Sequence, residues 1–509
     1  MAFLEIKDLT FTYAGEEKFA LRDVSCTIGE GELCLILSPN GGGKTTLLSL
    51  IHGDNPPRGE RTGSIHSNGT ATRSALLRQD PDLGLVADQV WREIAFAPEN
   101  RGLSQDEIRL RVAEAAGLFG LERLFDRDVA TLSGSEKIKT LLAAHLADRP
   151  DMLLLDEPAG GLDPVAEREL TEVLDRLRRE YGVTILVAEQ YCEPFFAAAD
   201  RILYLENGKL LFNGTPEDAA RFLLTTGRKG FVPEPARLAL SPEDTKTVPL
   251  TVQAGRAFLA DTPHRFETLR RTERPGETLL SLTDVSFRFE KDAPDLVAGM
   301  DLSLCRGEIL CLLGKGGAGK STLLRLLAGD LKPLRGKRKV KKDVRIAYLP
   351  QDVRAIFEGE TLREELTRVA GEEKADTALT EFGMLDLARR HPLDLSGGER
   401  QRAALAKISL IDPDAVLLDE PTRGLDRDSR QSLAQLLLSW KDAGKGILIV
   451  THDALFAAGI ASRCGLLWGG ELASLRETER FFKETRLFTT RTARITGGGA
   501  IVPEEVKRL

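Results

Sequence analysis

Residues 314–322 read Gly-Lys-Gly-Gly-Ala-Gly-Lys-Ser-Thr and follow a short apolar run at 309–313. The stretch is a full match to GxxxxGK[ST], a loop that holds phosphates between a strand and a helix. Its glycines let the backbone curl so that several N–H groups point at one phosphate, and the following helix N-terminus adds a favourable field. We expect Lys320 to reach the β- and γ-phosphates of a nucleotide and Ser321 to ligate Mg²⁺.

A second loop of this kind lies earlier in the chain. Residues 38–46 read Ser-Pro-Asn-Gly-Gly-Gly-Lys-Thr-Thr, with a serine in place of the first glycine. The two loop lysines are 276 residues apart, and the same offset takes Tyr13 to Phe289. Two matches at corresponding positions exclude chance agreement in practice. The nucleotide-binding candidates in the loops are Ser38, Pro39, Asn40, Gly41, Gly42, Gly43, Lys44, Thr45, Thr46, Gly314, Lys315, Gly316, Gly317, Ala318, Gly319, Lys320, Ser321 and Thr322.

The duplication extends well beyond the loops. Matching residues keep their order while the offset falls in small steps, as in the pairs Gln79 with Gln351, Ser133 with Ser396, Asp156 with Asp419, and Arg201 with Arg463. We therefore predict a first domain over 1–232, a proline-rich linker over 233–278, a second domain over 279–480, and a tail of unassigned role over 481–509. Repeated proline excludes a long continuous helix in the linker.

Each copy alternates short apolar runs with helical patterns. In the first copy, 33–37, 152–155 and 184–187 are apolar throughout, which is typical of strands buried on both faces of a parallel sheet. The polar stretch from Ser104 to Leu124 predicts a helix that begins with a capping box.

An apolar strand in each copy ends in two carboxylates, Asp156-Glu157 and Asp419-Glu420. A lone Asp-Glu pair is more often a solvated turn, but the apolar strand and the phosphate loop favour chemistry. We expect the aspartate to hold Mg²⁺ through water and the glutamate to polarise the attacking water.

A short serine-glycine element precedes each of these strands, at 132–136 and 395–399. Serine followed three residues later by glutamate is a helix-capping box, and a capped N-terminus with glycine also suits a second anion site. The candidates are Ser133, Gly134, Ser135, Glu136, Ser396, Gly397, Gly398 and Glu399.

The composition is that of a globular protein: 42% of the 509 residues are apolar, 29% are charged, and the net charge is −8. No run approaches the roughly 18 apolar residues of a membrane helix, and the N-terminus lacks signal-peptide features. The six cysteines form no CxxC pair, so we interpret them as small apolar residues in a reducing compartment. The basic cluster at 337–342 is either a solvated surface hairpin or a contact for RNA or anionic lipid.

Together, the phosphate loop, the downstream glutamine, the LSGG-type element, the Asp-Glu strand and a following Gly-Leu-Asp resemble the ABC ATPases, in both copies. The resemblance implies an α/β fold of tandem P-loop NTPase domains, each with a RecA-like core sheet, an antiparallel β subdomain and an inserted helical subdomain. In that family two such domains close head to tail on ATP, each phosphate loop facing the other domain's LSGG element. The resemblance therefore implies an intramolecular head-to-tail dimer that hydrolyses ATP with Mg²⁺.

The resemblance also implies further residue roles. Tyr13 and Phe289 would stack on adenine, and Asp163 and Asp426 would cross the domain interface. The Mg²⁺ candidates, with the Q-loop glutamines included, are Thr45, Gln79, Asp156, Ser321, Gln351 and Asp419.

The copies depart from the family pattern in complementary ways. Copy two has Val-Thr-His-Asp at 450–453, where His452 resembles the switch histidine that contacts the γ-phosphate, whereas copy one has Val-Ala-Glu-Gln at 187–190. A one-residue gap aligns Gln190 with His452; without it Glu189 would align instead. Copy one also has Ser135 where a glycine is usual. With Glu157, Glu420, His452 and Gln190 as catalytic candidates, we expect the site built on copy two to hydrolyse ATP faster.

Residues 79–90 and 93–100 of copy one look like the ATPases of energy-coupling factor (ECF) importers and related cobalt/nickel importers. That resemblance implies a cytoplasmic motor, peripheral on the inner face of the cell membrane. Its partners would be an integral T-type subunit and a substrate-binding membrane subunit, taking up a vitamin, a vitamin precursor or a metal ion. No specific nucleic acid is expected. In importers of this kind a separate membrane subunit selects the solute, so no residue of this chain identifies it.

The alternative is a soluble tandem ABC ATPase acting on ribosomes, like the ABC-F translation factors. The basic cluster and the short span between 319 and 351 favour it. The linker argues against it, because that family joins its domains with a long basic helical hairpin and 233–278 is broken by proline.

Overall fold

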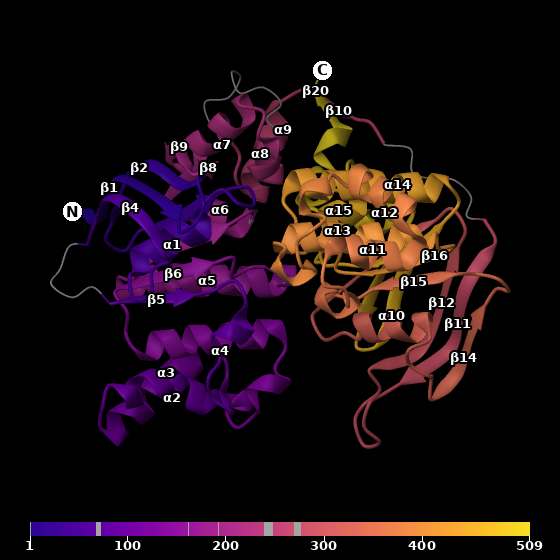
Figure 1. Cartoon of the computed structure of the whole chain (residues 1–509), viewed down its shortest axis with the longest axis horizontal. Helices are drawn as coiled ribbons and strands as arrows, with labels where there is room; N and C mark the ends of the chain where they lie inside the picture. Colours follow the sequence, from indigo (N-terminus) through magenta and orange to yellow (C-terminus); the bar gives the residue numbers. More distant parts are fainter. Residues whose placement is uncertain are drawn as a thin grey trace. The chain divides into compact units, whose positions relative to one another are not determined.

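The computed structural model describes residues 2–67, 73–160, 162–191, 193–238, 248–268 and 276–508. They divide into two compact units, Met1–Phe258 and Leu259–Leu509, so the boundary falls inside the proline-rich segment (Figure 1). Each unit has a core sheet, a small antiparallel sheet and a layer of helices.

The core sheet of unit 1 has six strands in the order β5-β6-β7-β3-β8-β9. The strands are β5 (Ser74–Leu77), β6 (Met152–Asp156), β7 (Thr184–Glu189), β3 (Leu33–Leu37), β8 (Arg201–Glu206) and β9 (Lys209–Gly214). The first five run parallel, and β9 pairs antiparallel with β8. Every residue of β3, β6 and β7 is buried, which confirms the apolar runs as strands covered on both faces.

The two faces of this sheet pack against different layers, because neighbouring residues of a strand point to opposite sides. Cys34 and Ile36 of β3 pack with helix α1 (Lys44–His52) and the antiparallel sheet of β1 (Ala2–Tyr13), β2 (Phe19–Gly29) and β4 (Gly59–Ser67). Leu33, Leu35 and Leu37 instead join a larger core built with the helices on the other face.

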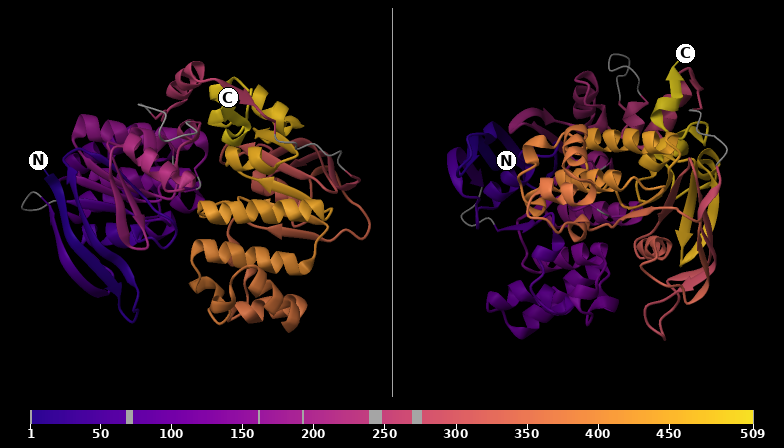
Figure 2. Two further views of the ribbon diagram at one scale, coloured as in Figure 1. Left: turned by 90° about the horizontal axis from the view of Figure 1, so that it is seen from above. Right: turned by 45° about the vertical axis from the view of Figure 1, so that its right-hand side comes forward.

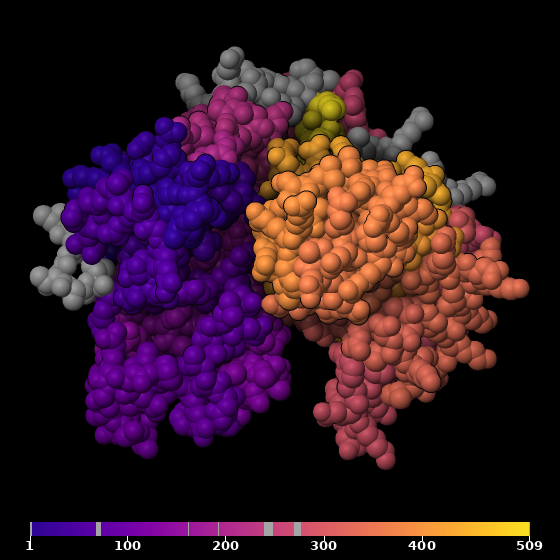
Figure 3. Space-filling view, viewed as in Figure 1, coloured from indigo at the N-terminus to yellow at the C-terminus, as the bar shows by residue number. Residues whose placement is uncertain are grey.

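Three helices form a separate layer in unit 1: α2 (Val90–Asn100), α3 (Gln105–Phe119) and α4 (Gly134–Ala147). In the space-filling view they make a lobe of their own (Figure 3). Ser104 caps α3 as expected and accepts from the amide of Glu107 at 3.3 Å. The helix ends at Phe119 rather than Leu124, because Gly120 adopts a left-handed conformation (φ 65°) that terminates it.

The remaining helices of unit 1 are α5 (Pro164–Tyr181), α6 (Glu193–Ala198), α7 (Pro216–Thr225), α8 (Glu234–Arg237) and the start of α9 (Val252–Asp261). In the described part of 233–278 the helices are short, as repeated proline predicts. Ala236, Val248 and Leu250 of this segment are buried in the core of unit 1.

Unit 2 repeats the architecture, with its core sheet in the order β15-β16-β17-β13-β18-β19 and a three-stranded sheet in the order β12-β11-β14. Its strands are β11 (Thr278–Phe287), β12 (Val297–Cys305), β13 (Ile309–Gly314), β14 (Arg335–Val340), β15 (Ile346–Leu349), β16 (Ala415–Asp419), β17 (Gly446–Val450), β18 (Arg463–Trp468) and β19 (Glu471–Glu477). Its helices are α10 (Lys320–Ala328), α11 (Leu362–Ala370), α12 (Glu372–Glu381), α13 (Gly397–Ile411), α14 (Arg427–Asp442), α15 (Ala454–Ile460), α16 (Thr478–Glu484) and α17 (Arg491–Thr496).

The tail folds onto unit 2. Its last strand, β20 (Val506–Arg508), pairs antiparallel with β10 (His264–Phe266), which comes from the proline-rich segment (Figures 1 and 2). Phe488, Ile501 and Val502 join the core of the unit.

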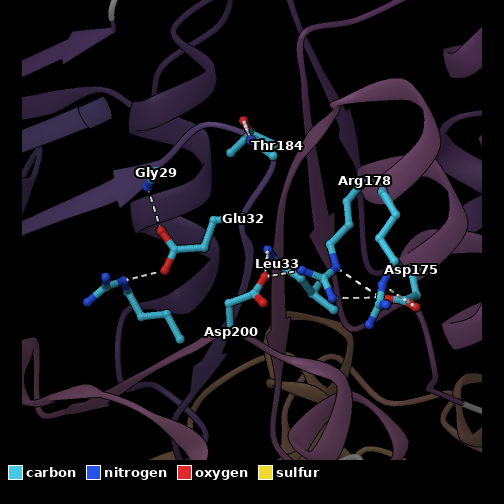
Figure 4. A network of polar contacts seen from close by, with 10 residues as sticks. Gly29, Glu32, Leu33, Asp175, Arg178, Thr184 and Asp200 are labelled. Atoms are coloured by element: carbon cyan, nitrogen blue, oxygen red, sulfur yellow. Dashed lines mark hydrogen bonds and ion pairs between the residues drawn. The ribbon is translucent and has the colours of Figure 1, made fainter. Parts of the chain in front are cut away.

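An ion pair recurs at the start of β3 and of its counterpart β13. Arg201 Nε donates to Glu32 Oε1 at 2.7 Å, and Arg463 Nε donates to Glu308 Oε1 at 2.7 Å. In unit 1 the network continues to Asp200, whose carboxylate accepts from the amide of Leu33 and from Arg178 of α5 (Figure 4). It ties the last turn of α5 to the sheet.

The cysteines behave as expected where they are described. Five of them are buried and form no disulfide among the described residues: Cys26, Cys34, Cys305, Cys311 and Cys464. Cys192 lies outside the described residues.

Candidate active sites

The phosphate loop of unit 2 connects β13 to α10. Gly319 caps the helix with φ 89°, a conformation that glycine adopts without strain. A Cβ at Gly314 would stand 2.5 Å from the carbonyl oxygen of Leu467, so only glycine fits there. Lys320 Nζ donates to the carbonyls of Gly314 (2.8 Å) and Lys315 (3.1 Å), which folds the lysine back over the loop.

The loop of unit 1 accommodates its serine. Ser38 is fully buried and its hydroxyl donates to the carbonyl of Pro39 at 3.1 Å. A Cβ at Gly42 would lie 1.9 Å from Ser38 Oγ, so the hydroxyl fills space that this glycine leaves. Lys44 Nζ still donates to the carbonyls of Ser38 (2.9 Å) and Pro39 (3.3 Å). The substitution therefore leaves the lysine geometry of the two loops alike.

A hydroxyl and an aspartate meet beside each loop. Thr45 Oγ1 donates to Asp156 Oδ2 at 2.7 Å, and Ser321 hydrogen-bonds to Asp419 in the same way. Burial raises the pKa of each aspartate from 3.8 to about 6. Asp156 Oδ1 is buried and has no hydrogen-bond partner among the described residues.

These groups fit Mg²⁺ held partly through water. The unpartnered oxygen of Asp156 would accept from a metal-bound water, and a nearby cation would offset the cost of burying its charge. Within the described ranges, no group of three or more His, Cys, Asp or Glu side chains is arranged to hold a metal. The hydroxyl and the phosphates of the nucleotide would supply further oxygen ligands to Mg²⁺.

The second carboxylate of each pair stands on a strained backbone. Glu157 and Glu420 have φ of 51° and 50°, a left-handed conformation that costs a side-chain-bearing residue about 1 kcal/mol. Glu157 gathers polar groups from three segments: Lys44 Nζ lies 3.5 Å from Oε1, and Gln79 Nε2 donates to Oε2 at 2.8 Å. Gln190 Nε2 donates to Oε1 at 2.9 Å.

The register of the core sheets identifies which residue of copy one is structurally equivalent to His452 of copy two. Asp156 pairs with Ala188, and Asp419 pairs with Val450. Two residues beyond these positions come Gln190 and His452, so Gln190 and not Glu189 occupies the equivalent place. Both side chains hydrogen-bond to the local glutamate, His452 Nδ1 lying 2.8 Å from Glu420 Oε2.

The Gln190–Glu157 pair and the His452–Glu420 pair nevertheless differ in charge. Burial lowers the pKa of His452, but the carboxylate of Glu420 more than offsets this, so its pKa is raised. For Glu420 burial acts in the opposite direction and raises the pKa, but the neighbouring His452 lowers it further than burial raises it, so the net shift of the Glu420 pKa is downward. At this one position Glu420 therefore has a cationic partner, whereas Glu157 has the neutral amide of Gln190 in addition to Lys44.

Glu189 is the copy-one residue equivalent to Thr451 of copy two, and it is buried. Its Oε1 accepts from the amide of Ala159 at 2.8 Å, and burial together with the charge of Glu157 raises its pKa well above the ordinary value. It holds the backbone that follows Glu157 and does not contact Lys44 as Glu157 does.

Both serine-glycine elements are capping boxes, as predicted. Ser133 begins α4 and Ser396 begins α13; each accepts from the amide of the glutamate three residues later, and that glutamate accepts from the serine amide. An added Cβ at Gly134 or Gly397 would meet nothing within 4 Å, so these N-termini are open.

The other predicted residues lie near helix starts and strand ends. Tyr13 hydrogen-bonds Thr46 through its hydroxyl at 2.8 Å, which fixes its ring beside the phosphate loop. Phe289 is 62% exposed and packs edge-on against Phe287. Asp163 and Asp426 cap α5 and α14, and Gln351 is exposed after β15.

Sequence reasoning missed one pair of residues. Glu93 Oε2 accepts from the amides of Val86 (2.9 Å) and Ala87 (2.7 Å), and Glu365 Oε2 does the same for two amides of the matching loop in copy two. Both are buried and fix the loop that follows the Q-loop glutamine. The signal was available, since the offset from Gln79 to Gln351 also relates these glutamates.

Comparisons with known proteins agree with this geometry. The profile of the ABC transporter family matches residues 21–160 and 297–423. A protein of Bacillus thuringiensis subsp. konkukian, named provisionally as an ABC transporter ATP-binding protein, is 34% identical over 525 residues, covering 96% of this chain and 94% of the relative. A Streptomyces avermitilis protein of the same name is 32% identical over 522 residues, covering 92% and 93%. Ribosome-bound archaeal ABCE1 gives a TM-score of 0.70 at 23% identity, covering 93% of this chain and 79% of that chain, which is a likeness of fold.

The fold and the paired phosphate loops define a tandem P-loop ATPase. The chain belongs to the ABC transporter family, as a tandem ABC ATPase. ABC ATPase domains bind ATP with Mg²⁺, and the residues described above fit that pair. In the part of the chain that the structure describes, no helix has the length and apolar character to span a membrane.

Proposed function

We propose that this chain is the ATP-hydrolysing motor subunit of an importer of the ECF or cobalt type. It would act at the cytoplasmic face of the cell membrane with an integral T-type subunit and a substrate-binding membrane subunit. Its cargo would be a vitamin, a vitamin precursor or a metal ion. The similarity to proteins named provisionally as ABC transporter ATP-binding proteins, over nearly the whole chain, supports a membrane partner.

The observation that carries the proposal is the loop after Gln79. Leu83 and Val86 are 74% and 62% exposed, although large apolar side chains on a rigid loop are costly to leave in water. Glu93 fixes the backbone at Val86, and Gln79 itself donates to Glu157. A partner helix that covered this apolar pair would therefore press on a loop that reaches a catalytic candidate.

Hydrolysis would use the glutamates as bases. Glu157 and Glu420 would orient and polarise the attacking water, while Lys44 and Lys320 would swing from the loop carbonyls to the nucleotide phosphates. Mg²⁺ held near Asp156 and Asp419 would neutralise developing charge on the phosphates. We propose that the copy-two site is faster, because Glu420 is paired with the histidine His452 where Glu157 has the neutral amide of Gln190.

Purification of the tagged chain from detergent-solubilised membranes tests the transport role. We expect small integral membrane proteins to co-purify in fixed ratio. The Leu83→Asp/Val86→Asp variant should lose them while it keeps ATP turnover. Leu110→Asp is the matched control, because Leu110 is a 54% exposed apolar residue on α3, away from the loop. Ribosomes in place of membrane proteins would overturn the proposal in favour of a translation factor.

Among the residues that the structure describes, no contact favours the ribosomal alternative. The basic cluster lies on and after the edge strand β14, where it is mostly exposed. Two of its members are used internally: Arg338 donates to the carbonyls of Leu327 and Ala328 at 2.9 Å, and Lys341 pairs with Glu277. The likeness to ABCE1 is one of fold alone.

A further inference from the structure

A cavity of about 670 Å³ lies in unit 1, at the edge of the core sheet where the parallel strands begin. Arg73, Asp151 and Val183, which line it, directly precede β5, β6 and β7. The phosphate loop and the Asp-Glu pair follow the opposite, carboxyl ends of β3 and β6. The cavity is therefore separate from the nucleotide site, and its size falls in the range of about 300–1,000 Å³ that small-molecule sites occupy.

The wall of this cavity is basic on one side and apolar on the other. Its charged side chains are four arginines and two acids: Arg73, Arg111, Arg149, Arg176, Glu114 and Asp151. Leu118, Leu146 and Tyr181 supply apolar and aromatic surface. An excess of guanidinium groups beside an apolar wall suits an organic anion, because guanidinium binds carboxylate and phosphate through paired hydrogen bonds.

Two of the four arginines, Arg73 and Arg149, are weakly matched by the protein. Within the described part of the chain, the guanidinium of Arg73 has one long contact, 3.5 Å to the carbonyl of Asp148. Arg149 approaches Glu114 only at 3.4 Å, with both side chains more than half exposed. The other two are paired, Arg111 with Glu107 at 2.6 Å and Arg176 with Glu180 at 2.9 Å, although the buried Nε of Arg111 has no hydrogen-bond partner in that same part.

Copy two provides an internal reference for this place. The amide of Arg73 donates to Asp151 at 2.9 Å, and the amide of Arg345 donates to Asp414 at 3.1 Å, so these residues correspond. Two residues before each aspartate, Arg149 and Asp412 share the same left-handed backbone, with φ of 55° and 48°. The pairing of Met152 with Thr184 and of Ala415 with Gly446 likewise makes Val183 the counterpart of Lys445.

In copy two the side chains at these positions neutralise one another's charge. The carboxylate of Asp412 accepts from Arg345 at 3.1 Å and from Lys445 at 2.6 Å. In copy one the acid is replaced by an arginine and the lysine by a valine, which leaves Arg73 without the carboxylate that its counterpart has. Arginine in the left-handed region also costs about 1 kcal/mol, which aspartate there reduces.

We propose that the cavity binds a small organic anion, whose phosphate or carboxylate takes the place of the Asp412 carboxylate between Arg73 and Arg149. The apolar body of the ligand packs against Leu118, Leu146 and Tyr181. The wall is preorganised, because Arg178 in the last turn of α5 pairs with Asp200, just before β8, and is itself held by Asp175 of the same helix (Figure 4). Thr184, next to Val183, accepts from the amide of Gly31 at 3.0 Å.

Calorimetric titration of phenyl phosphate into the full chain tests the site, with ADP at saturation so that both phosphate loops are occupied. We expect one saturable site, bound more weakly by inorganic phosphate, which lacks the apolar body. Arg149→Asp rebuilds the acid of copy two and should weaken phenyl phosphate binding at least about tenfold, equal to about 1.4 kcal/mol. Arg109→Asp, the same charge change at an exposed residue of α3, should bind as the wild type does.

Arg149→Asp should melt no lower than the wild type, since Asp412 occupies that backbone conformation in copy two. Should it not fold, Arg73→Gln is expected to show the same loss of binding. The proposal is overturned by the absence of saturable binding to the wild type. Equal affinities in Arg149→Asp and Arg109→Asp, or binding of phenol as tight as that of phenyl phosphate, would also overturn it.

Discussion

Replacing His452 by glutamine should turn the copy-two site into a replica of the copy-one site. Glutamine reproduces the geometry already present in copy one, where Gln190 Nε2 lies 2.9 Å from Glu157 Oε1, but it removes the positive charge. A hydrogen bond between charged partners contributes about 1.5–3 kcal/mol and a neutral one about 1 kcal/mol. The difference of roughly 1–1.5 kcal/mol corresponds to about a tenfold fall in turnover.

The assay is steady-state phosphate release at saturating MgATP, with Gln190→Ala as the matched change in copy one. Because the copy-one site contributes the smaller share of turnover, Gln190→Ala should cost little. The reciprocal change Gln190→His should raise turnover. The reasoning is refuted if His452→Gln leaves turnover intact, or if Gln190→Ala costs as much as His452→Gln.

The same pair makes a pH-dependent contribution to stability. The raised pKa of His452 means that its contribution is complete below 6.5 and is lost as pH rises through the raised value. The lowered pKa of Glu420 means that its contribution is present above 4.5 and is lost as pH falls through the lowered value. The unfolding free energy of the wild type should therefore exceed that of His452→Gln most between pH 4.5 and 6.5, and denaturant titrations across this window would show it.

Three other changes have defined outcomes. Glu420→Gln should reduce total ATP turnover more than Glu157→Gln, and equal losses would contradict the proposed asymmetry of the sites. Glu93→Ala leaves two amides without their acceptor, so the unfolding free energy of unit 1 should fall by about 2–4 kcal/mol; unchanged denaturation and unchanged proteolysis of the loop at 80–89 would disprove its role. Without nucleotide, Asp156→Asn should stabilise the chain by up to about 3 kcal/mol above pH 6, because the raised pKa marks a carboxylate that is costly to bury ionised. That gain should vanish as pH falls below 3.8, where the wild-type aspartate becomes protonated in both states, and a gain independent of pH would exclude this explanation.

Local sequence patterns were sufficient to predict many of the strands and helix starts of this structure. The apolar runs gave β3, β6 and β7, since a strand buried on both faces needs no polar position. The two capping boxes were visible because their partners are three residues apart. The duplication aligned the phosphate loops and the carboxylate strands without any knowledge of the fold.

Features that depend on distant pairing could not be predicted in this way. Strands β10 and β20 have three residues each and come from opposite ends of unit 2, so neither carries a periodic signal. The equivalence of Gln190 with His452 required the sheet register, because the sequence allowed either of two alignments. The basic cavity needed the fold as well, since its arginines belong to four separate segments.

We propose that both phosphate loops hold the nucleotide through their lysines. Lys44 and Lys320 are the two side chains that rest on the loop carbonyls and face the place where phosphates would bind. The decisive measurement is ATP hydrolysis and ATP affinity of the Lys44→Ala/Lys320→Ala double variant, compared with the wild type. We expect turnover to be abolished and affinity to fall sharply; a double variant that consumed and bound ATP like the wild type would contradict the account.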